Sequence, residues 1–374
     1  MSLAANRTPP LAGHPVFTDL PETVFESMSR LARQHGAINL GQGFPDGQGP
    51  DDVRAAAARA LESVSNQYPP MMGLPSLRTA IAAHYRHHQG LDLDPEREVM
   101  VTSGATEALA GALIALVRRA GGVPRFVTLK PPHFRIEEAA LAAVFSERTR
   151  LVLLNNPLNP SATVFGADDL GLLAAFCRRF EAIAICDEVW EHVIFDGRRH
   201  LPLMALPGMR ERTVKIGSAG KIFSLTGWKV GFVMAAEPLM RVLSRAHQFL
   251  TFTTPPNLQE AVAYGLGKDD AYFEGMRADL ARSRDRLAAG LSRIGFTVLP
   301  SAGTYFLTVD LAGLADDDVA FCQRIVAEHG VAAIPVSAFY AQGSVKTLAR
   351  FCFAKADDTL DAAVERLAGL FRAA

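Results

Sequence analysis

Lys221 is the residue with the clearest chemical potential in this sequence. It lies in the segment GSAGKIFSLTGWKVG, where Gly217, Gly220 and Gly227 are its nearest glycines. Ser218 stands three residues before it and Lys229 eight residues after it. A lysine amine attacks a carbonyl carbon to form a Schiff base when its surroundings lower its pKa, and glycines let a bound group approach the backbone closely. The segment predicts a carbonyl site with a phosphate site near Lys229; a surface loop with ordinary lysines is the plainer alternative.

Asp187 ends the apolar run AIAIC, so its carboxylate is expected at the mouth of a sheet. A carboxylate there can keep the pyridine nitrogen of pyridoxal phosphate protonated, so that the ring accepts electrons. An acid at a strand end is also common as a helix N-cap or a metal ligand. The residue alone leaves these alternatives open.

The segment GATEALAGALIALV follows a strand-like run and is expected to begin a helix at Gly104, Ala105 and Thr106. The first amide N–H groups of a helix, together with the helix dipole, attract a phosphate. Many strand-to-helix turns of this kind bind nothing, so the segment by itself is a weak signal.

Asn159 and Arg350 are the remaining polar candidates. Asn159 lies in NNPLNP, where two prolines restrict the loop and direct an amide toward the same sheet mouth. Arg350 precedes the run FCFA and could bind a substrate carboxylate through two parallel hydrogen bonds. A single arginine is more often a surface ion-pair partner.

Two other patterns are set aside. GQGFPDG begins like a dinucleotide fingerprint, but Pro45 and Asp46 stand where the helix should start. In HYRHH, His84 and His88 are spaced i, i+4, yet no acid or cysteine accompanies them in the sequence, so a solvent-exposed helix face is expected. No metal site is assigned.

The elements that must position these residues alternate between short apolar runs and Ala/Leu-rich stretches of helical period, which indicates a mostly parallel sheet covered by helices. Ligands of such sheets bind at the carboxyl ends of the strands, where TSGAT, NNPLNP, CDEVW and GSAGK lie. Beyond Pro255, a long helix over Ala271–Ile294 leads to a second, smaller unit. The predicted strands are 99–102, 126–129, 151–154, 182–186, 213–216 and 230–234, then 304–311, 331–336 and 349–354 in the second unit, with a closing helix from about Ala356.

Composition bounds the function. The 374 residues, 49% hydrophobic and 21% charged, fit an ordinary globular protein, and a formal net charge of -1 disfavours nucleic acid as the main ligand. The longest strongly apolar run, 108–117, is too short to span a bilayer. The N-terminus has no secretory apolar region, and four scattered cysteines suggest reduced thiols, so a cytoplasmic location without membrane contact is expected.

Taken together and in order, these segments resemble fold-type I pyridoxal 5′-phosphate enzymes, specifically class I/II aminotransferases of the kynurenine, glutamine or methionine type. The likeness runs from about Ile38 to the C-terminus. The strings that carry it are INLGQGFPD, NQYPPMMGLPSLR, VTSGATEAL, NNPLNP, CDEVWEHVIFDG, KIGSAGKIFSLTGWKVG and RFCFAK.

The resemblance implies a role for each candidate. Lys221 would be the Schiff-base lysine and the base that moves the Cα proton, and Asp187 the partner of the pyridinium. Asn159 would hydrogen-bond the cofactor's phenolic oxygen and Trp190 would lie near it. The phosphate would be lined by Ala105, Thr106, Ser218 and Lys229, with Tyr68 reaching it from the second subunit of a homodimer. The substrate carboxylate would be held by Gly43 and Arg350, near Asn159.

The resemblance also implies a domain division: an N-terminal arm over 1–45 that belongs to the small domain, a large cofactor domain over 46–270, and a smaller α+β C-terminal domain over 271–374. The sequence departs from the family after Val117, where relatives continue with an acidic turn, a strand and a loop bearing the aromatic ring that stacks on the pyridine. Here the chain runs directly into RRAGGVPRFVTL. A parallel crossover needs a dozen or more residues, so on the order of 20 residues are missing.

Smaller departures lie near the same site. Trp190 stands where relatives usually have Tyr, so an indole that only donates a hydrogen bond replaces a phenol. Ser161 and Ala162 replace the usual Thr-Gly, and Lys229 replaces an Arg that could bind phosphate through two hydrogen bonds. These changes are expected to affect the rate more than the type of reaction.

The expected function is transfer of the amino group of a neutral amino acid, apolar, sulfur-containing or aromatic, to a 2-oxo acid. Two alternatives remain at this point. One is β-elimination on cysteine conjugates, which uses the same covalent chemistry and differs in the bond that breaks. The other is a non-catalytic protein that keeps the fold, which the missing segment favours and the retained Lys221, Asp187, Asn159 and Arg350 disfavour.

Overall fold

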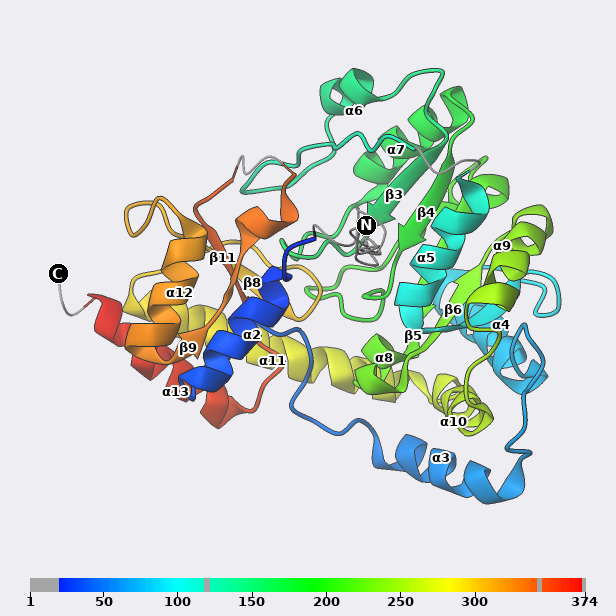
Figure 1. Cartoon of the computed structure of the whole chain (residues 1–374), viewed down its shortest axis with the longest axis horizontal. Helices are drawn as coiled ribbons and strands as arrows, with labels where there is room; N and C mark the ends of the chain where they lie inside the picture. Colours follow the sequence, from blue (N-terminus) through cyan, green and yellow to red (C-terminus); the bar gives the residue numbers. More distant parts are fainter. Residues whose placement is uncertain (1–19, 118–121, 342–344, 372–374) are drawn as a thin grey trace, which may run out of the picture.

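The computed structural model describes residues 20–117, 122–341 and 345–371. These residues form a five-stranded sheet, on the right in Figure 1, and a four-stranded sheet, on the left. Residues 118–121, where the sequence suggests an interrupted family pattern, lie outside the described ranges.

The larger sheet has the order β2-β6-β5-β4-β3. Strands β3, β4 and β5 are parallel, whereas β6 is antiparallel to both β5 and β2, so β6 alone opposes the other four. Strands β5 and β6 are buried along their whole length, as their continuous apolar runs predict. The bounds are β2 Val99–Ser103, β3 Leu151–Asn155, β4 Ile183–Asp187, β5 Thr213–Ser218 and β6 Val230–Met234, which confirms five of the six strands predicted for this unit.

Helices cover both faces of this sheet, because successive strand residues point to opposite sides. Met100 and Ile185 face α5 (Gly104–Leu116), while Val101 faces α4 (Pro75–Gln89) and Cys186 faces α7 (Ala167–Arg179). Helix α9 (Glu237–Leu250) packs on α5. Helix α10 (Pro256–Leu266) packs against both α3 (Asp51–Ser63) and α4. The result is the helix–sheet–helix layering expected from the sequence.

The predicted strand over 126–129 is wrong. The described residues between α5 and α6 (Glu138–Val144) form no strand, and Val123 and Phe126 are 68% and 65% exposed. The segment crosses toward the smaller sheet, where Tyr340 Oη donates a hydrogen bond to the Leu129 carbonyl at 2.8 Å. A β-branched, aromatic run becomes a strand only where a neighbouring strand completes its hydrogen bonds, and here none does.

The smaller sheet has the antiparallel order β10-β11-β8-β7, with the short parallel pair β1-β9 beside it. The predicted strands at 304–311 and 349–354 are confirmed, and the run 331–336 divides into β9 and β10. Figure 1 shows the N-terminal helix α2 lying beside this sheet and α12, far from it in sequence. The bounds are α2 Val24–Gln34, β1 Ile38–Asn39, β7 Thr297–Val298, β8 Phe306–Asp310, α12 Asp318–His329, β9 Val331–Ala332, β10 Ile334–Pro335, β11 Leu348–Cys352 and α13 Asp357–Leu367.

Helix α11 (Asp270–Ile294) connects the two sheets and confirms the long helix predicted over Ala271–Ile294. Its C-terminal end packs on α13. None of the helices in the described ranges is both long enough and apolar enough to cross a membrane. The remaining elements are short: α8 Ala219–Ile222 and the 3₁₀ turns η1 Leu203–Ala205, η2 Arg210–Arg212, η3 Thr226–Trp228, η4 Val336–Phe339 and η5 Ala368–Phe371.

Candidate active site

Lys221 lies in α8, the single helical turn that follows β5, and its side chain reaches Gly43, Trp190 and Tyr305. Its Nζ donates a hydrogen bond to the Gly43 carbonyl at 3.4 Å and lies 4.5 Å from the centroid of the Trp190 ring. Burial lowers the pKa of this ammonium, with Arg350 and Lys229 acting in the same direction and Asp187 opposing them. A lysine with a lowered pKa has more of the neutral amine that attacks carbonyl carbon.

Asp187 ends β4, at the same edge of the sheet. Among the described residues its carboxylate accepts one weak hydrogen bond, from the Val189 amide at 3.5 Å. Burial is the main cause that raises the pKa of Asp187 from 3.8 to about 6. A partly buried carboxylate with so few hydrogen bonds is suited to a cationic N–H donor, such as a pyridinium.

The N-terminus of α5 and the residues around Lys229 form the polar end of the site. The side chain of the N-cap residue Ser103 accepts no hydrogen bond from α5, and of the backbone amides there Glu107 accepts only that of Ser103, so the amides of Gly104, Ala105 and Thr106 are available to an anion. Lys229 Nζ donates to Thr106 Oγ1 at 3.1 Å. The backbone of β6 lies so close to the start of α5 that a Cβ on Gly231 would lie 2.5 Å from the Gly104 carbonyl carbon. Ser218, buried at the end of β5, precedes α8.

Arg350 and Asn159 meet at the opposite end. From β11, the Arg350 guanidinium donates to Asn159 Oδ1 at 2.8 Å through Nη1 and to the Gly41 carbonyl at 2.6 Å through Nη2. Its Nε is buried and has no hydrogen-bond partner among the described residues. The side chain is 1% exposed, and burial lowers the pKa of Arg350 to about 10. A buried cation of this kind is suited to a carboxylate.

Gly43 lies between Lys221 and the smaller sheet. A Cβ there would lie 2.3 Å from the Phe306 ring, so only glycine fits without displacing that ring. The Arg350 guanidinium stacks on the same ring, 3.8 Å from the Phe306 centroid. The accepting carbonyl for Arg350 is that of Gly41 rather than that of Gly43.

Trp190 and Tyr68 have different positions relative to this group. Trp190 is 4% exposed and packs edge to face on Tyr305 at 4.6 Å. Tyr68 is 83% exposed and contacts Phe252, and no described contact brings it to Lys221 within one chain.

Sequence reasoning missed two residues that support the site. Tyr305 Oη donates to the Lys221 carbonyl at 2.7 Å and thereby fixes the turn that carries the lysine. Asn155 Oδ1 accepts from the Asn159 amide at 2.7 Å while its Nδ2 donates to the Asp187 carbonyl at 3.1 Å. Asn155 could have been found, because it lies in the same NNPLNP segment; nothing in the sequence distinguishes Tyr305 from core aromatics.

A buried charged group behind Asp187 was also missed. Lys215, on β5, is 0% exposed and forms ion pairs with Glu188 and Glu191. Tyr85 donates to Glu191, and His200 Nε2 lies 2.9 Å from Glu188 Oε2. The group connects the loop after β4 to the next strand, so it stabilises the backbone next to Asp187.

The expectation of a solvent-exposed face at His84 and His88 is wrong. His84 is 3% exposed, and its Nε2 lies 2.8 Å from His192 Nε2. The His88 ring packs against Phe273 at 4.9 Å. The charged, polar appearance of HYRHH concealed a face that α11 covers.

The residues present therefore fit pyridoxal phosphate. Within the described ranges they supply a partly buried lysine, a partly buried carboxylate with one weak hydrogen bond, free amides at a helix start beside a lysine, and a buried arginine whose Nε has no partner. The cofactor's carbonyl would meet the lysine, its ring nitrogen the carboxylate, and its phosphate the helix amides. The substrate's carboxylate would meet the arginine.

Comparison with known proteins agrees with this site. The family model for aminotransferase class I and II matches residues 35–119 and 111–367. A methionine aminotransferase of Escherichia coli strain K12 is 41% identical over 379 residues, which cover 96% of this chain and 98% of that protein. A probable N-succinyldiaminopimelate aminotransferase of Mycobacterium tuberculosis is 43% identical over 380 residues, covering 93% and 96%.

A crystal structure of YbdL from Escherichia coli, described as having a methionine aminotransferase function, superposes with a TM-score of 0.93 at 41% identity and covers 96% of this chain and 100% of that one. These names describe amino-group transfer and give no support to the elimination or non-catalytic alternatives. The chain belongs to the class I and II aminotransferase family, and it is a pyridoxal 5′-phosphate-dependent enzyme that transfers amino groups.

Proposed function

We propose that the enzyme moves the amino group of a neutral L-amino acid, apolar, sulfur-containing or aromatic, to a 2-oxo acid. The observation that carries this proposal is the surroundings of Arg350. Its guanidinium lies 3.8 Å from the ring centroid of Phe306 and 5.5 Å from those of Phe25 and Phe339. A substrate whose carboxylate binds this arginine meets aromatic rings, which favour an uncharged side chain.

The roles proposed for the site residues follow from their positions. Pyridoxal phosphate, when bound, supplies a carbonyl carbon and an electron-accepting ring. Lys221 would hold that carbon and, once its amine is free again, would carry the proton removed from the substrate Cα, and Asp187 would keep a proton at the ring nitrogen. Arg350, near Gly43, would bind the substrate carboxylate, and Asn159 and Trp190 would hold the cofactor's phenolic oxygen. The phosphate is bound by Ala105, Thr106, Ser218 and Lys229.

A panel of amino donors tests the substrate class. Methionine, phenylalanine, kynurenine, aspartate and N-succinyl-diaminopimelate are compared by kcat/KM with one 2-oxo acid acceptor. We expect the neutral donors to exceed aspartate by about 100-fold or more, because a carboxylate buried among aromatic rings without a partner costs about 3 kcal/mol or more. A preference for aspartate or for the succinylated donor contradicts the proposal. A cysteine conjugate without acceptor, assayed for pyruvate, measures elimination.

We also propose a homodimer with shared active sites. Tyr68 and Phe249 are 83% and 85% exposed, and Tyr68 packs on Phe252 beside the end of α9. Aromatic side chains gathered on a surface mark an interface, and one that carries Tyr68 would bring it to the partner's phosphate site. Light scattering is expected to give twice the 40.3 kDa chain mass, and Phe249→Asp is expected to shift it toward one chain.

The division into 1–45, 46–270 and 271–374 is likewise a proposal, supported by β1, which pairs with β9 of the smaller sheet, and by α11, which begins at Asp270.

A cytoplasmic location is supported by the four cysteines, which are all free and buried.

We propose further that the chain lacks a sheet strand and the aromatic loop after Val117. Strand β3 ends the sheet, and its Leu153 is 62% exposed. The family model matches in two segments that overlap at 111–119, which is where a continuous match would be interrupted by missing residues.

A further inference from the structure

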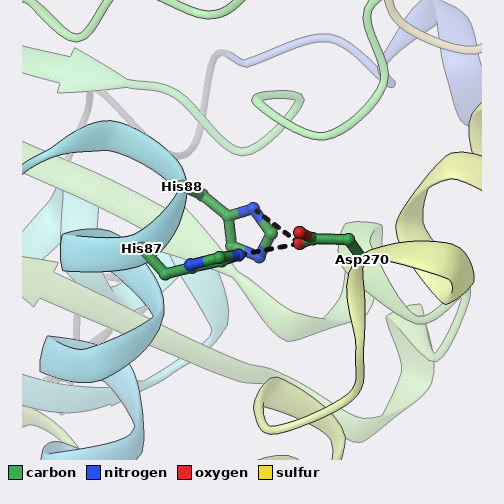
Figure 2. A group of neighbouring side chains, drawn as sticks. All are labelled: His87, His88 and Asp270. Atoms are coloured by element: carbon green, nitrogen blue, oxygen red, sulfur yellow. Dashed lines mark hydrogen bonds and ion pairs between the residues drawn. The ribbon is translucent and has the colours of Figure 1, made fainter.

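His87, His88 and Asp270 form a compact group on the surface, away from Lys221. Figure 2 shows both imidazole rings, from α4, directed at the carboxylate at the start of α11. His87 Nε2 lies 2.8 Å and His88 Nδ1 3.9 Å from Asp270 Oδ1, and one ligand atom from each of the three residues lies within 4.8 Å of the others. The sequence suggested no acid near these histidines because Asp270 is 182 positions beyond His88.

The carboxylate of Asp270 is not needed to cap its own helix. The preceding residue, Asp269, is the N-cap of α11, and its side chain accepts from the Tyr272 amide at 3.2 Å. Within the described ranges, the ion pairs of Asp270 are those with His87 and His88. Its oxygens are therefore available to a third participant.

The His88 ring is already held in place. It packs between Phe273 at 4.9 Å and His192 at 5.0 Å, and its side chain is 17% exposed. His87 and Asp270, by contrast, are 62% and 58% exposed, so the group is open to solvent on one side. A held ligand beside two accessible ones needs little reorganisation to bind an ion, and water can complete the coordination.

The second group of this kind shows why the surface one is the better candidate. Glu188, Glu191 and His200 also bring three ligand atoms together, but the Lys215 ammonium already lies against both carboxylates. A metal ion would have to displace a buried cation there. At His87, His88 and Asp270, the positive charge of Arg277 acts on both Asp270 and His88, but within the described ranges no lysine or arginine forms an ion pair with Asp270, so no cation has to leave the group.

We propose that His87, His88 and Asp270 bind one divalent transition-metal ion of the zinc class, with water in the remaining positions. Imidazole nitrogen and carboxylate oxygen are ligands for zinc, nickel and copper, with bonds of about 2.0 to 2.2 Å to zinc. Bonds of that length bring ligand atoms to about 3.4 Å from one another in a tetrahedron. The two contact distances of 2.8 and 3.9 Å lie on either side of that value. A bound ion would join α4 to the start of α11.

Zinc binding to the holoenzyme tests the proposal by competition with a chromophoric chelator. We expect one Zn²⁺ per chain in the wild-type protein and at least about tenfold weaker binding in His87→Ala and in Asp270→Asn. His35→Ala, which removes an exposed histidine from the end of α2, serves as the matched control and is expected to bind zinc like the wild type.

A second measurement separates ligand loss from misfolding. Zinc is expected to raise the melting temperature of the wild type and of His35→Ala but not that of His87→Ala or Asp270→Asn, with similar melting temperatures for all four without zinc. No zinc uptake by the wild type, or equal affinity in the wild type and both ligand variants, overturns the proposal.

Discussion

The two sides of the central sheet differ in how completely they are built. On the β4-β5-β6 side, charged residues are buried with partners, as Lys215 is between Glu188 and Glu191, and the catalytic candidates follow directly from these strands. On the β3 side, the sheet ends in a strand whose Leu153 is 62% exposed, and Phe126 lies 65% exposed in the segment that precedes it.

The difference teaches that the candidate catalytic residues lie on strands that are enclosed by the sheet. Lys221, Asp187 and Lys229 are carried by β5, β4 and the turn before β6, each of which has neighbours on both sides. Under the proposal that a strand and an aromatic loop are missing, the exposed edge would affect what covers the cofactor rather than what reacts with it. Changes on the first side should therefore abolish activity or folding, and repair of the second should improve binding.

The largest effect is expected at Lys221. Lys221→Ala should lower kcat by about 10⁴-fold or more, because it removes both the amine that binds the carbonyl carbon and the base. The half-reaction with methionine is monitored by visible absorption. The wild-type protein should show a cofactor band that disappears when methionine is added. Lys346→Ala, an exposed lysine, is the control and should keep wild-type turnover. A Lys221→Ala protein within tenfold of wild type contradicts the assignment.

Lys215 tests whether the buried charges hold the first side together. Lys215→Met should destabilise the fold by about 3 to 5 kcal/mol, because it leaves Glu188 and Glu191 buried without a cation. Urea unfolding measures the change, with Lys346→Met as the exposed match. Adding Glu188→Gln and Glu191→Gln to the variant should recover part of the loss. If Lys215→Met alone is as stable as the wild type, these buried charges do not stabilise the fold.

Asp187 gives a pH-dependent test of the same side in cofactor-free protein. Since burial raises the pKa of Asp187 from 3.8 to about 6, the folded state holds this proton more tightly than the unfolded state. The resulting stability is present below pH 3.8 and is lost as the pH rises through about 6, a loss of about 3 kcal/mol. Asp187→Asn, which does not ionise, should thus be more stable than wild type at pH 7 and equal near pH 3.8 while binding the cofactor more weakly.

Urea midpoints between pH 4 and 7 measure this difference, and Asp316→Asn, at an exposed position, is the matched variant. A difference between Asp187→Asn and wild type that does not change with pH would show that burial does not penalise this carboxylate.

The smallest effect is expected from repairing the second side. Inserting after Val117 the corresponding strand and loop of the Escherichia coli methionine aminotransferase should tighten pyridoxal phosphate binding by about tenfold, because a stacking aromatic ring and a covered sheet edge contribute about 1.4 kcal/mol. An absorbance titration measures the affinity. A Gly/Ser insert of equal length controls for chain length, and equal affinity for the chain with and without the family segment would refute the missing-strand proposal.

Much of the fold follows from local patterns. The apolar runs predict five strands of the larger sheet, and the alternating segments predict β8 and β11, because burial of each strand is written in its own side chains. The direction of β6 does not follow, since a strand buried on both faces has the same pattern whichever way it runs. The run at 126–129 fails for the opposite reason: its composition favours a strand, but no partner is there.

The site divides in the same way. Lys221, Asp187, Asn159 and Arg350 could be proposed from the sequence because each is a reactive or polar side chain beside or within an apolar run. Lys215 was not, because one lysine within an apolar strand gives no sign of the two carboxylates that meet it. His84 was misjudged because nothing in α4 shows that α11 covers its histidines.

The sequence by itself determined the reactive groups and the strands that present them, because residue type and local hydrophobic period are properties of short segments. Only the tertiary structure decided which distant groups meet: Arg350 with Asn159, Lys215 with Glu188, and Asp270 with His87. These pairs are separated by tens to hundreds of residues, and their contacts arise from packing of whole elements, which no local pattern records.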